Sequence, residues 1–138
     1  MNEGLSRPGG RALILVVERD PHVRELEAYF LEEAGFAVEF TDDGVTALQR
    51  ALDLKPDIVI TEILVPKLDG LSLCRQLKKN ESLAHVRVLI FSILAASQRA
   101  KEAGADAFLI KPLAEHTLVQ TVRRLVADRS AAQVGGGA

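Results

Sequence analysis

Six polar or charged residues follow apolar runs of the chain, and their chemical types suit the handling of a phosphoryl group. They are Glu18, Arg19, Asp20, Glu62, Ser92 and Lys111. Carboxylates hold a hard divalent cation, while a hydroxyl and an ammonium group can meet phosphoryl oxygens. These residues are far apart in the sequence, so they form one site only if the fold brings the ends of the apolar runs together.

The apolar runs have the length and character of buried strands. We predict strands over residues 12–17, 37–41, 58–61, 86–91 and 107–110. Segments with helical spacing of apolar residues lie between and after them, the last covering about residues 114–128. The first is expected to bury Val23, Leu26, Phe30, Leu31 and Ala34, and the second Val45, Leu48, Ala51 and Leu52. Strands that alternate with helices predict an open parallel sheet with helices on both faces. The carboxyl ends of parallel strands share one edge, so this topology would gather the six residues there.

One globular domain is predicted over residues 11–129. The chain has 138 residues, of which 48% are hydrophobic and 26% are charged, and this composition suits a single core. Residues 1–10 and 130–138 lack an apolar period and are rich in glycine. We therefore expect a flexible N-terminal segment and a flexible C-terminal tail or linker.

Composition argues against several classes of function. The formal net charge is -2 and the charges are interspersed, so we expect no direct binding to nucleic acid. The longest apolar run, residues 12–17, is too short to cross a bilayer, which favours a cytoplasmic protein without membrane contact. Cys74 is the only cysteine and is expected to be a small buried hydrophobe. No phosphate-binding loop or nucleophile motif is present, and we expect no enzymatic activity.

Three stretches resemble the receiver domain of two-component response regulators. They are LILVVERD at 13–20, PDIVITEILVPKLDG at 56–70 and GADAFLIKPL at 104–113. The resemblance covers residues 11–128. It implies a flavodoxin-like, doubly wound sheet of five parallel strands in the order 2-1-3-4-5, and a role in phosphorelay signal transduction.

The resemblance also implies roles for single residues. In the family, an aspartate after the third strand accepts a phosphoryl group from a histidine kinase, and Mg²⁺ bridges it to an acidic pair after the first strand. Glu18 matches the first acid of that pair, Ser92 the switch hydroxyl and Lys111 the lysine. Two positions depart from the pattern: Arg19 replaces the second, metal-binding acid, and Glu62 replaces the acceptor aspartate.

Glu62 is expected to make phosphoryl transfer slow or absent. Its carboxylate lies one methylene further from the backbone than that of aspartate, and a displacement of about 1 Å can reduce a rate on the order of 100-fold. The longer side chain also brings negative charge towards Ser92 and Lys111. Two interpretations stay open: Glu62 imitates the phosphorylated state, or it only disables phosphorylation.

Arg19 is expected to weaken or abolish Mg²⁺ binding. Two unit charges about 4 Å apart interact by roughly 4 kcal/mol at an effective dielectric constant near 20, so the guanidinium repels a divalent ion. Weak candidate ligands remain in Glu18, Asp20 and Glu62, although Asp20 also suits the N-cap of a helix. A further hypothesis is that Arg19 acts as a substitute cation, paired with Glu62 or Glu18. No cofactor is expected.

The resemblance assigns a switch and a docking surface as well. Phe108 occupies the aromatic switch position of the fifth strand and is expected to be buried. The chain from Ser92 to Gly104 is shorter than is usual in the family, which predicts a shortened fourth helix. Helix four, strand five and helix five form the implied protein-binding face, for a histidine kinase, an output domain or a second copy of the chain.

The favoured function is therefore a phosphorylation-independent pseudo-receiver. A first alternative is a slow phosphoacceptor that uses Glu62. A second is a small α/β domain that binds a ligand at the sheet edge, and the absence of a glycine-rich loop after the first strand counts against it.

Overall fold

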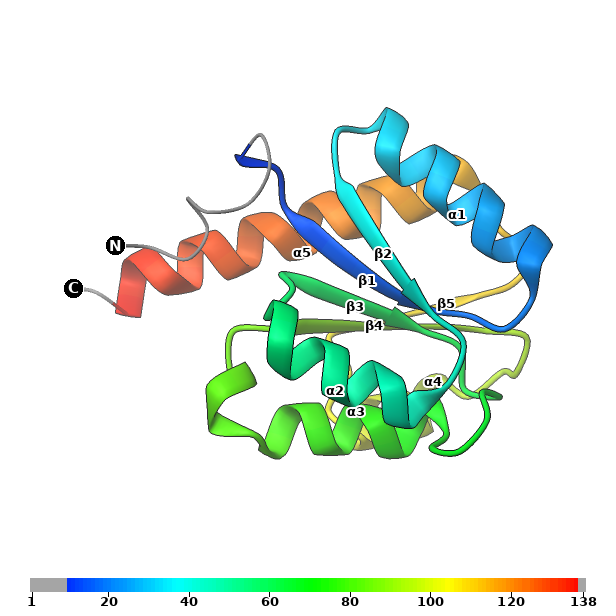
Figure 1. Cartoon of the computed structure of the whole chain (residues 1–138). Helices are drawn as coiled ribbons and strands as arrows, with labels where there is room; N and C mark the ends of the chain where they lie inside the picture. The colour runs from blue at the N-terminus through cyan, green and yellow to red at the C-terminus, as the bar shows by residue number, and fades with distance from the viewer. Residues whose placement is uncertain (1–9, 137–138) are drawn as a thin grey trace.

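A parallel sheet of five strands forms the centre of the molecule, as the computed structural model shows (Figure 1). The structure describes the backbone of residues 10–136 and the side chains of residues 10–128. The strands are β1 (Leu13–Val17), β2 (Ala37–Thr41), β3 (Ile58–Thr61), β4 (Arg87–Ser92) and β5 (Ala107–Ile110). Their order is β2-β1-β3-β4-β5, which confirms the predicted flavodoxin-like topology.

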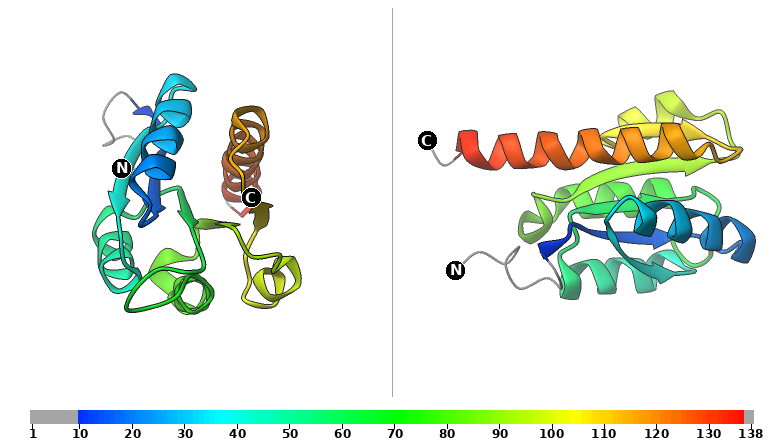
Figure 2. Two further views of the ribbon diagram at one scale, coloured as in Figure 1. Left: turned by 90° about the vertical axis from the view of Figure 1, so that its right-hand side faces the viewer. Right: turned by 90° about the horizontal axis from the view of Figure 1, so that it is seen from above.

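Helices cover both faces of the sheet (Figure 2). They are α1 (Pro21–Glu33), α2 (Gly44–Leu54), α3 (Gly70–Lys79), α4 (Ser97–Glu102) and α5 (Glu115–Gly136), with a short 3-10 helix, η3 (Glu81–Leu83). The helices α1 and α5 enclose one apolar core, and α2, α3 and α4 enclose the other. The inner strands are buried on both faces, which explains their continuous apolar runs.

The C-terminal helix is longer than the sequence pattern predicts. We expected it to end near residue 128, but α5 continues to Gly136, so residues 130–136 are helical. We placed the end of the helix where the helical spacing of apolar residues stops, but a helix can continue without that spacing. No proline occurs in residues 129–136 to interrupt it. Of the two predicted flexible ends, residues 1–9 and 137–138 lie outside the described residues. Within residues 10–136, no helix has the length and apolar character of a membrane span.

The buried face of α1 differs from the predicted one at Leu26. Val23, Leu31 and Ala34 pack in the core as expected, but Leu26 is 47% exposed, and the neighbouring Glu27 is fully buried. Val23, Glu27 and Leu31 are spaced four residues apart, and this stripe faces the sheet. A glutamate therefore occupies a core position.

The helix α2 buries only part of the predicted face. Of the four residues expected to be buried, Ala51 lies in the core and Leu48 packs against it, but Val45 and Leu52 are exposed. Ala47 also lies in the core. The first residue of α2 lies close to the loop before α3. A Cβ atom on Gly44 would lie 1.8 Å from the Leu68 carbonyl oxygen.

Register aligns the ends of the strands at one edge of the sheet. Val17 pairs with Thr61, and Ser92 pairs with Ile110. Pairing continues one residue beyond the strands, since the Glu62 amide donates to the Val17 carbonyl at 3.1 Å and the Lys111 amide donates to the Ser92 carbonyl at 2.8 Å. The residues that follow β1, β3, β4 and β5 are thus neighbours in space.

Cys74 of α3 is buried, as expected for a small apolar residue. Its Sγ lies 3.4 Å from the carbonyl oxygen of Ala103, and burial raises the pKa of the thiol to about 11. The thiol is therefore protonated at neutral pH and is a poor nucleophile.

Candidate functional site at the carboxyl edge of the sheet

Glu62 begins a tight loop between β3 and α3. The loop folds back so closely that a Cβ atom on Gly70 would lie 2.2 Å from the Glu62 carbonyl oxygen. The Gly70 amide donates to the carbonyl of Ile63 at 2.9 Å, and Asp69 caps α3 by accepting from the Ser72 amide at 2.9 Å. The residues Asp69 and Gly70 thereby fix the backbone from which Glu62 projects.

Both oxygens of the Glu62 carboxylate have partners. Oε1 accepts a short hydrogen bond from the Ser92 hydroxyl and a second one, at 2.6 Å, from the Ile63 amide. Oε2 accepts from the Ile93 amide at 3.2 Å and lies 3.0 Å from Lys111 Nζ. The residue is only 5% exposed. Glu62 is therefore held in one position by three different segments of the chain.

These contacts favour the ionised form of Glu62. Burial alone would raise its pKa, but the hydrogen bonds from Ser92 and Lys111, the positive charge of Lys111 and the Ile63 amide outweigh that effect. The pKa of Glu62 is lowered below its ordinary value. Hydrogen bonds to the charged form of an acid act in this direction.

Lys111 joins two carboxylates. Its Nζ lies 2.8 Å from Glu18 Oε1 and 3.0 Å from Glu62 Oε2, and it also lies 5.6 Å from the centre of the Phe91 ring. Burial acts to lower the pKa of Lys111, but hydrogen bonds and charges from the two glutamates raise it above its ordinary value. The site thus contains an ammonium ion between two acids.

Glu18 and Asp20 are engaged by the backbone of the β1–α1 loop. Glu18 Oε2 accepts from the Asp20 amide at 3.0 Å. Asp20 is the N-cap of α1, where its Oδ1 accepts from the amides of His22 at 2.9 Å and Val23 at 3.4 Å. The capping interpretation of Asp20 thus agrees with its contacts, and its carboxylate is directed to the helix end.

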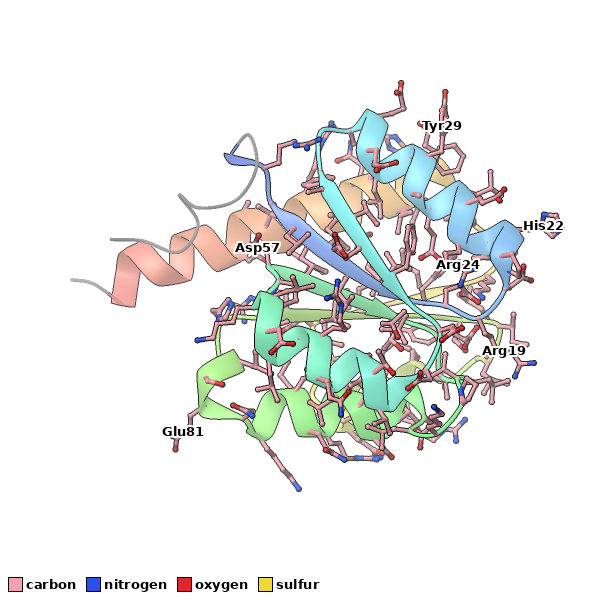
Figure 3. The ribbon with its side chains drawn as sticks, viewed as in Figure 1. Arg19, His22, Arg24, Tyr29, Asp57 and Glu81 are labelled. Carbon is pink, nitrogen blue, oxygen red and sulfur yellow. The ribbon has the colours of Figure 1, made fainter. Side chains whose placement is uncertain are left out.

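Arg19 does not form the ion pair that the substitute-cation hypothesis requires. Its side chain is exposed and extends outward at the mouth of the site (Figure 3), and it makes no ion pair with Glu18 or Glu62. Successive residues of an extended chain point in opposite directions, so the inward position of Glu18 turns Arg19 outward. Lys111 holds the position that we expected for Arg19.

Ser92 and Phe108 lie at different distances from the acid. Ser92 is fully buried, and its hydroxyl accepts from the Leu94 amide at 3.1 Å while it donates to Glu62. Phe108 lies further back along β5, opposite Ile90, and packs half-buried against the core beneath α2, α3 and α4. The helix α4 after Ser92 has only six residues, in agreement with the predicted shortening.

The site opens to solvent through a cleft of about 310 Å³. The residues that line it are Glu18, Arg19, Asp20, Glu62, Leu64, Ile93 and Lys111. No group of three or more metal-binding side chains is found within residues 10–128. Mg²⁺ requires oxygen ligands in near-octahedral geometry, and here Lys111 already lies between the two acids that would supply them. The ammonium group of Lys111 therefore lies where a divalent ion shared by Glu18 and Glu62 would have to bind.

The sequence pattern did not point to Glu27, which is a third buried glutamate near this edge, beside Glu18 and Glu62. It is 0% exposed, and neither carboxylate oxygen has a hydrogen-bond partner. Burial raises its pKa to about 8, with additions from the charges of Glu18 and Glu62 and an opposing effect from Lys111. Its spacing between Val23 and Leu31 on an apolar stripe is the signal that could have identified it.

Comparison with known proteins identifies the family. The response regulator receiver domain matches residues 14–123. The chain belongs to this family.

Individual relatives support the assignment. Over 82% of its length, the receiver chain is 32% identical to the DNA-binding dual master transcriptional regulator RpaA of Synechocystis and 38% identical to the response regulator MprA of a Mycobacterium species. It spans 48% and 50% of these two proteins, which is about half of their length. It also resembles the crystal structure of the receiver domain of a signal transduction histidine kinase from Syntrophus aciditrophicus. That match has a TM-score of 0.79 and 34% identity, and it covers 85% of this chain and 91% of the other.

Proposed function

We propose that this receiver domain signals in a two-component system without accepting a phosphoryl group. The observation that carries the proposal is the set of contacts at Glu62. In the family, the hydroxyl and the lysine respond to phosphoryl oxygens. Here the corresponding groups, Ser92 and Lys111, are bound to the Glu62 carboxylate itself. Glu62 thus acts as a permanent anion at the position where phosphorylation would create one.

The same contacts disfavour chemistry at Glu62. To accept a phosphoryl group, one carboxylate oxygen must form a bond to phosphorus while the bond from phosphorus to the donor breaks. Both oxygens of Glu62 are occupied by hydrogen-bond donors, and one of them also by an ammonium group. Transfer would require these contacts to break first, in a side chain that is longer than the aspartate of the family.

We also propose that the domain works without Mg²⁺ and without enzymatic turnover. Lys111 supplies positive charge between Glu18 and Glu62, and Arg19 adds a second positive charge at the mouth of the cleft. A divalent ion would meet repulsion from both. Nucleophilic catalysis is not supported either, because Ser92 donates to a carboxylate and no histidine lines the cleft.

A partner protein is proposed to contact the face formed by α4, β5 and α5. Ile93 and Ile110, which follow or end neighbouring strands, are 61% and 51% exposed. Ile110 also borders an apolar pocket of about 180 Å³ between β5 and the start of α5. Since Ile93 donates its amide to Glu62, this apolar surface is connected directly to the acid. An output domain or a histidine kinase in the same system is the expected class of partner.

The intact mass of the purified domain after incubation with a small acyl-phosphate donor and Mg²⁺ tests the proposal. We expect no adduct on the natural chain. An Arg19→Asp, Glu62→Asp double variant restores both acids of the family pattern and is expected to gain one phosphoryl group. An adduct on the natural chain that is absent from a Glu62→Gln variant would overturn the proposal and show a slow phosphoacceptor that uses Glu62.

A further inference from the structure

Glu27 is an exception among the buried polar groups of the domain. It lies on the face of α1 that packs against the sheet, between Val23 and Leu31, and it is completely buried. Neither of its carboxylate oxygens accepts or donates a hydrogen bond. Buried polar atoms nearly always have a partner, so an orphaned carboxyl group calls for an explanation. A group of this kind is tolerated most readily in its neutral, protonated form.

The charged groups that act on Glu27 come from the carboxyl ends of three strands. Glu18 after β1 and Glu62 after β3 disfavour its ionisation, while Lys111 after β5 favours it. Arg24 lies one turn earlier on α1 (Figure 3), and its Nη1 lies 3.5 Å from the carbonyl oxygen of Glu18. Lys111 is therefore the cation of the site that is affected by the ionisation state of Glu27.

The charged groups on α5 that face α1 lie in a separate groove. Glu115 and Arg123, with the histidine His116, line this groove together with Phe30 and Glu33 of α1. None of them contributes to the shift at Glu27, so the orphaned acid responds to the functional site rather than to the helix pair.

Lys111 lies at the boundary between the cleft and the core that contains Glu27. Its ammonium contacts Glu18 and Glu62, while the ring of Phe91, a member of the core under α1 and α5, lies 5.6 Å away. A lysine side chain has a flexible four-carbon stem and can reorient between neighbouring acids. An additional negative charge on the α1 side would compete for it.

We propose that Glu27 is a buried proton-binding site that controls how strongly Lys111 is paired with Glu62. The structure shows Lys111 shared by Glu18 and Glu62, and this is the arrangement that we assign to the state with the proton bound. When the proton leaves to water or a buffer base, only the O–H bond of Glu27 breaks, and a third carboxylate then draws Lys111 towards α1. Glu62 keeps its contacts with Ser92, Ile63 and Ile93 but loses part of its positive partner. This switch does not depend on whether the domain accepts a phosphoryl group.

The effect should be visible at the exposed edge of the site. Ile63 and Ile93 both donate their amides to Glu62, and Ile93 is largely exposed. A weaker contact between Lys111 and Glu62 therefore changes the surroundings of these two isoleucines. The pKa of Glu27, raised to about 8, places the change in mildly alkaline solution.

The test is a pH titration of the natural domain with labelled isoleucine methyl groups, followed by NMR from pH 6 to 10. We expect the methyl signals of Ile63 and Ile93 to shift with a midpoint near pH 8. A Glu27→Gln variant should lose this transition, while a Glu25→Gln variant, changed at an exposed position of the same helix, should keep it. A transition that persists unchanged in Glu27→Gln, or the lack of any transition in the natural chain, would overturn the switch.

A second measurement covers the case in which Glu27→Gln does not fold. The side-chain carboxyl carbon of Glu27, followed by ¹³C NMR in the natural chain, reports its ionisation directly. A midpoint near pH 8 together with coincident shifts at Ile63 and Ile93 supports the switch. A midpoint in the ordinary range of glutamate, near 4.5, contradicts it.

Discussion

Two buried glutamates near the same edge of the sheet have opposite properties. Glu62 is 5% exposed and accepts hydrogen bonds at both oxygens, and its pKa is lowered. Glu27 is 0% exposed and has no hydrogen-bond partner, and its pKa is raised to about 8. The difference shows that partners, rather than burial, decide which acid is charged. One glutamate is a fixed anion of the site, and the other holds a proton beside it.

Substitution of Glu27 by leucine should change the free energy of unfolding more than the other substitutions considered, and the size of this change depends on pH. Below about pH 4.5, Glu27 is protonated in both the folded and the unfolded chain and does not oppose folding. As the pH rises, the unfolded chain releases this proton but the folded chain retains it until about pH 8. The free energy of unfolding of the natural chain therefore falls by about 1.4 kcal/mol per pH unit in this window, or about 5 kcal/mol in total.

Urea unfolding of the natural chain and of Glu27→Leu at pH 5, 6.5, 8 and 9 measures this contribution. The free energy of unfolding of Glu27→Leu should not fall with pH for this reason. The difference in this free energy between the variant and the natural chain should therefore grow up to pH 8 and then stay constant. Other titrating groups are common to both chains and cancel in the difference. Parallel stability curves would show that Glu27 finds a partner or water when the chain is in solution.

Removal of Glu62, the acid with partners, should destabilise the domain, whereas removal of Glu27, the acid without them, should not. In Glu62→Ala, Lys111 keeps only Glu18, and the Ser92 hydroxyl and the Ile93 amide lose their acceptor. Loss of one member of a buried ion pair costs about 3 to 5 kcal/mol. Urea unfolding at pH 7 should show this loss, and a Glu62→Gln variant, which keeps an acceptor oxygen, should show a smaller one. Equal stability of Glu62→Ala and the natural chain would mean that the Lys111 contact contributes little.

A smaller change removes only one donor from Glu62. Ser92→Ala leaves Glu62 Oε1 with the Ile63 amide and leaves the Leu94 amide without its acceptor. Loss of such a buried partner costs about 1 to 3 kcal/mol, and the pKa of Glu62 should rise because a group that stabilises its charge is gone. Thermal unfolding measures the stability, with Ser92→Thr as the control that retains a hydroxyl. If threonine fails to restore stability, packing around Ser92 matters more than its hydrogen bond.

The sequence predicted the sheet well because its inner strands are buried on both faces. Continuous apolar runs such as residues 58–61 have no competing interpretation once helical segments separate them. The same topology placed Glu18, Glu62, Ser92 and Lys111 at one edge, and the structure brings all four together.

The orientation of single side chains was harder to predict. Glu27 was overlooked because a helical face is identified from its apolar members, and Leu26 offered a plausible alternative. Which of two adjacent residues faces the core depends on how α1 rests on the sheet. That rotation is set by packing of the whole layer and cannot be derived from the period of one helix.

Arg19 is the last case of this kind, and its substitution should have the smallest effect. A buried pair between Arg19 and Glu18 or Glu62 would make Arg19→Ala strongly destabilising. The exposed side chain instead predicts a change within about 0.5 kcal/mol by urea unfolding, as for other surface substitutions. A Lys111→Ala variant should lose much more, because Lys111 is the cation between Glu18 and Glu62. If Arg19→Ala instead matched the loss in Lys111→Ala, Arg19 would reach the acids in solution, and the contrast between a partnered and an orphaned glutamate would involve two cations instead of one.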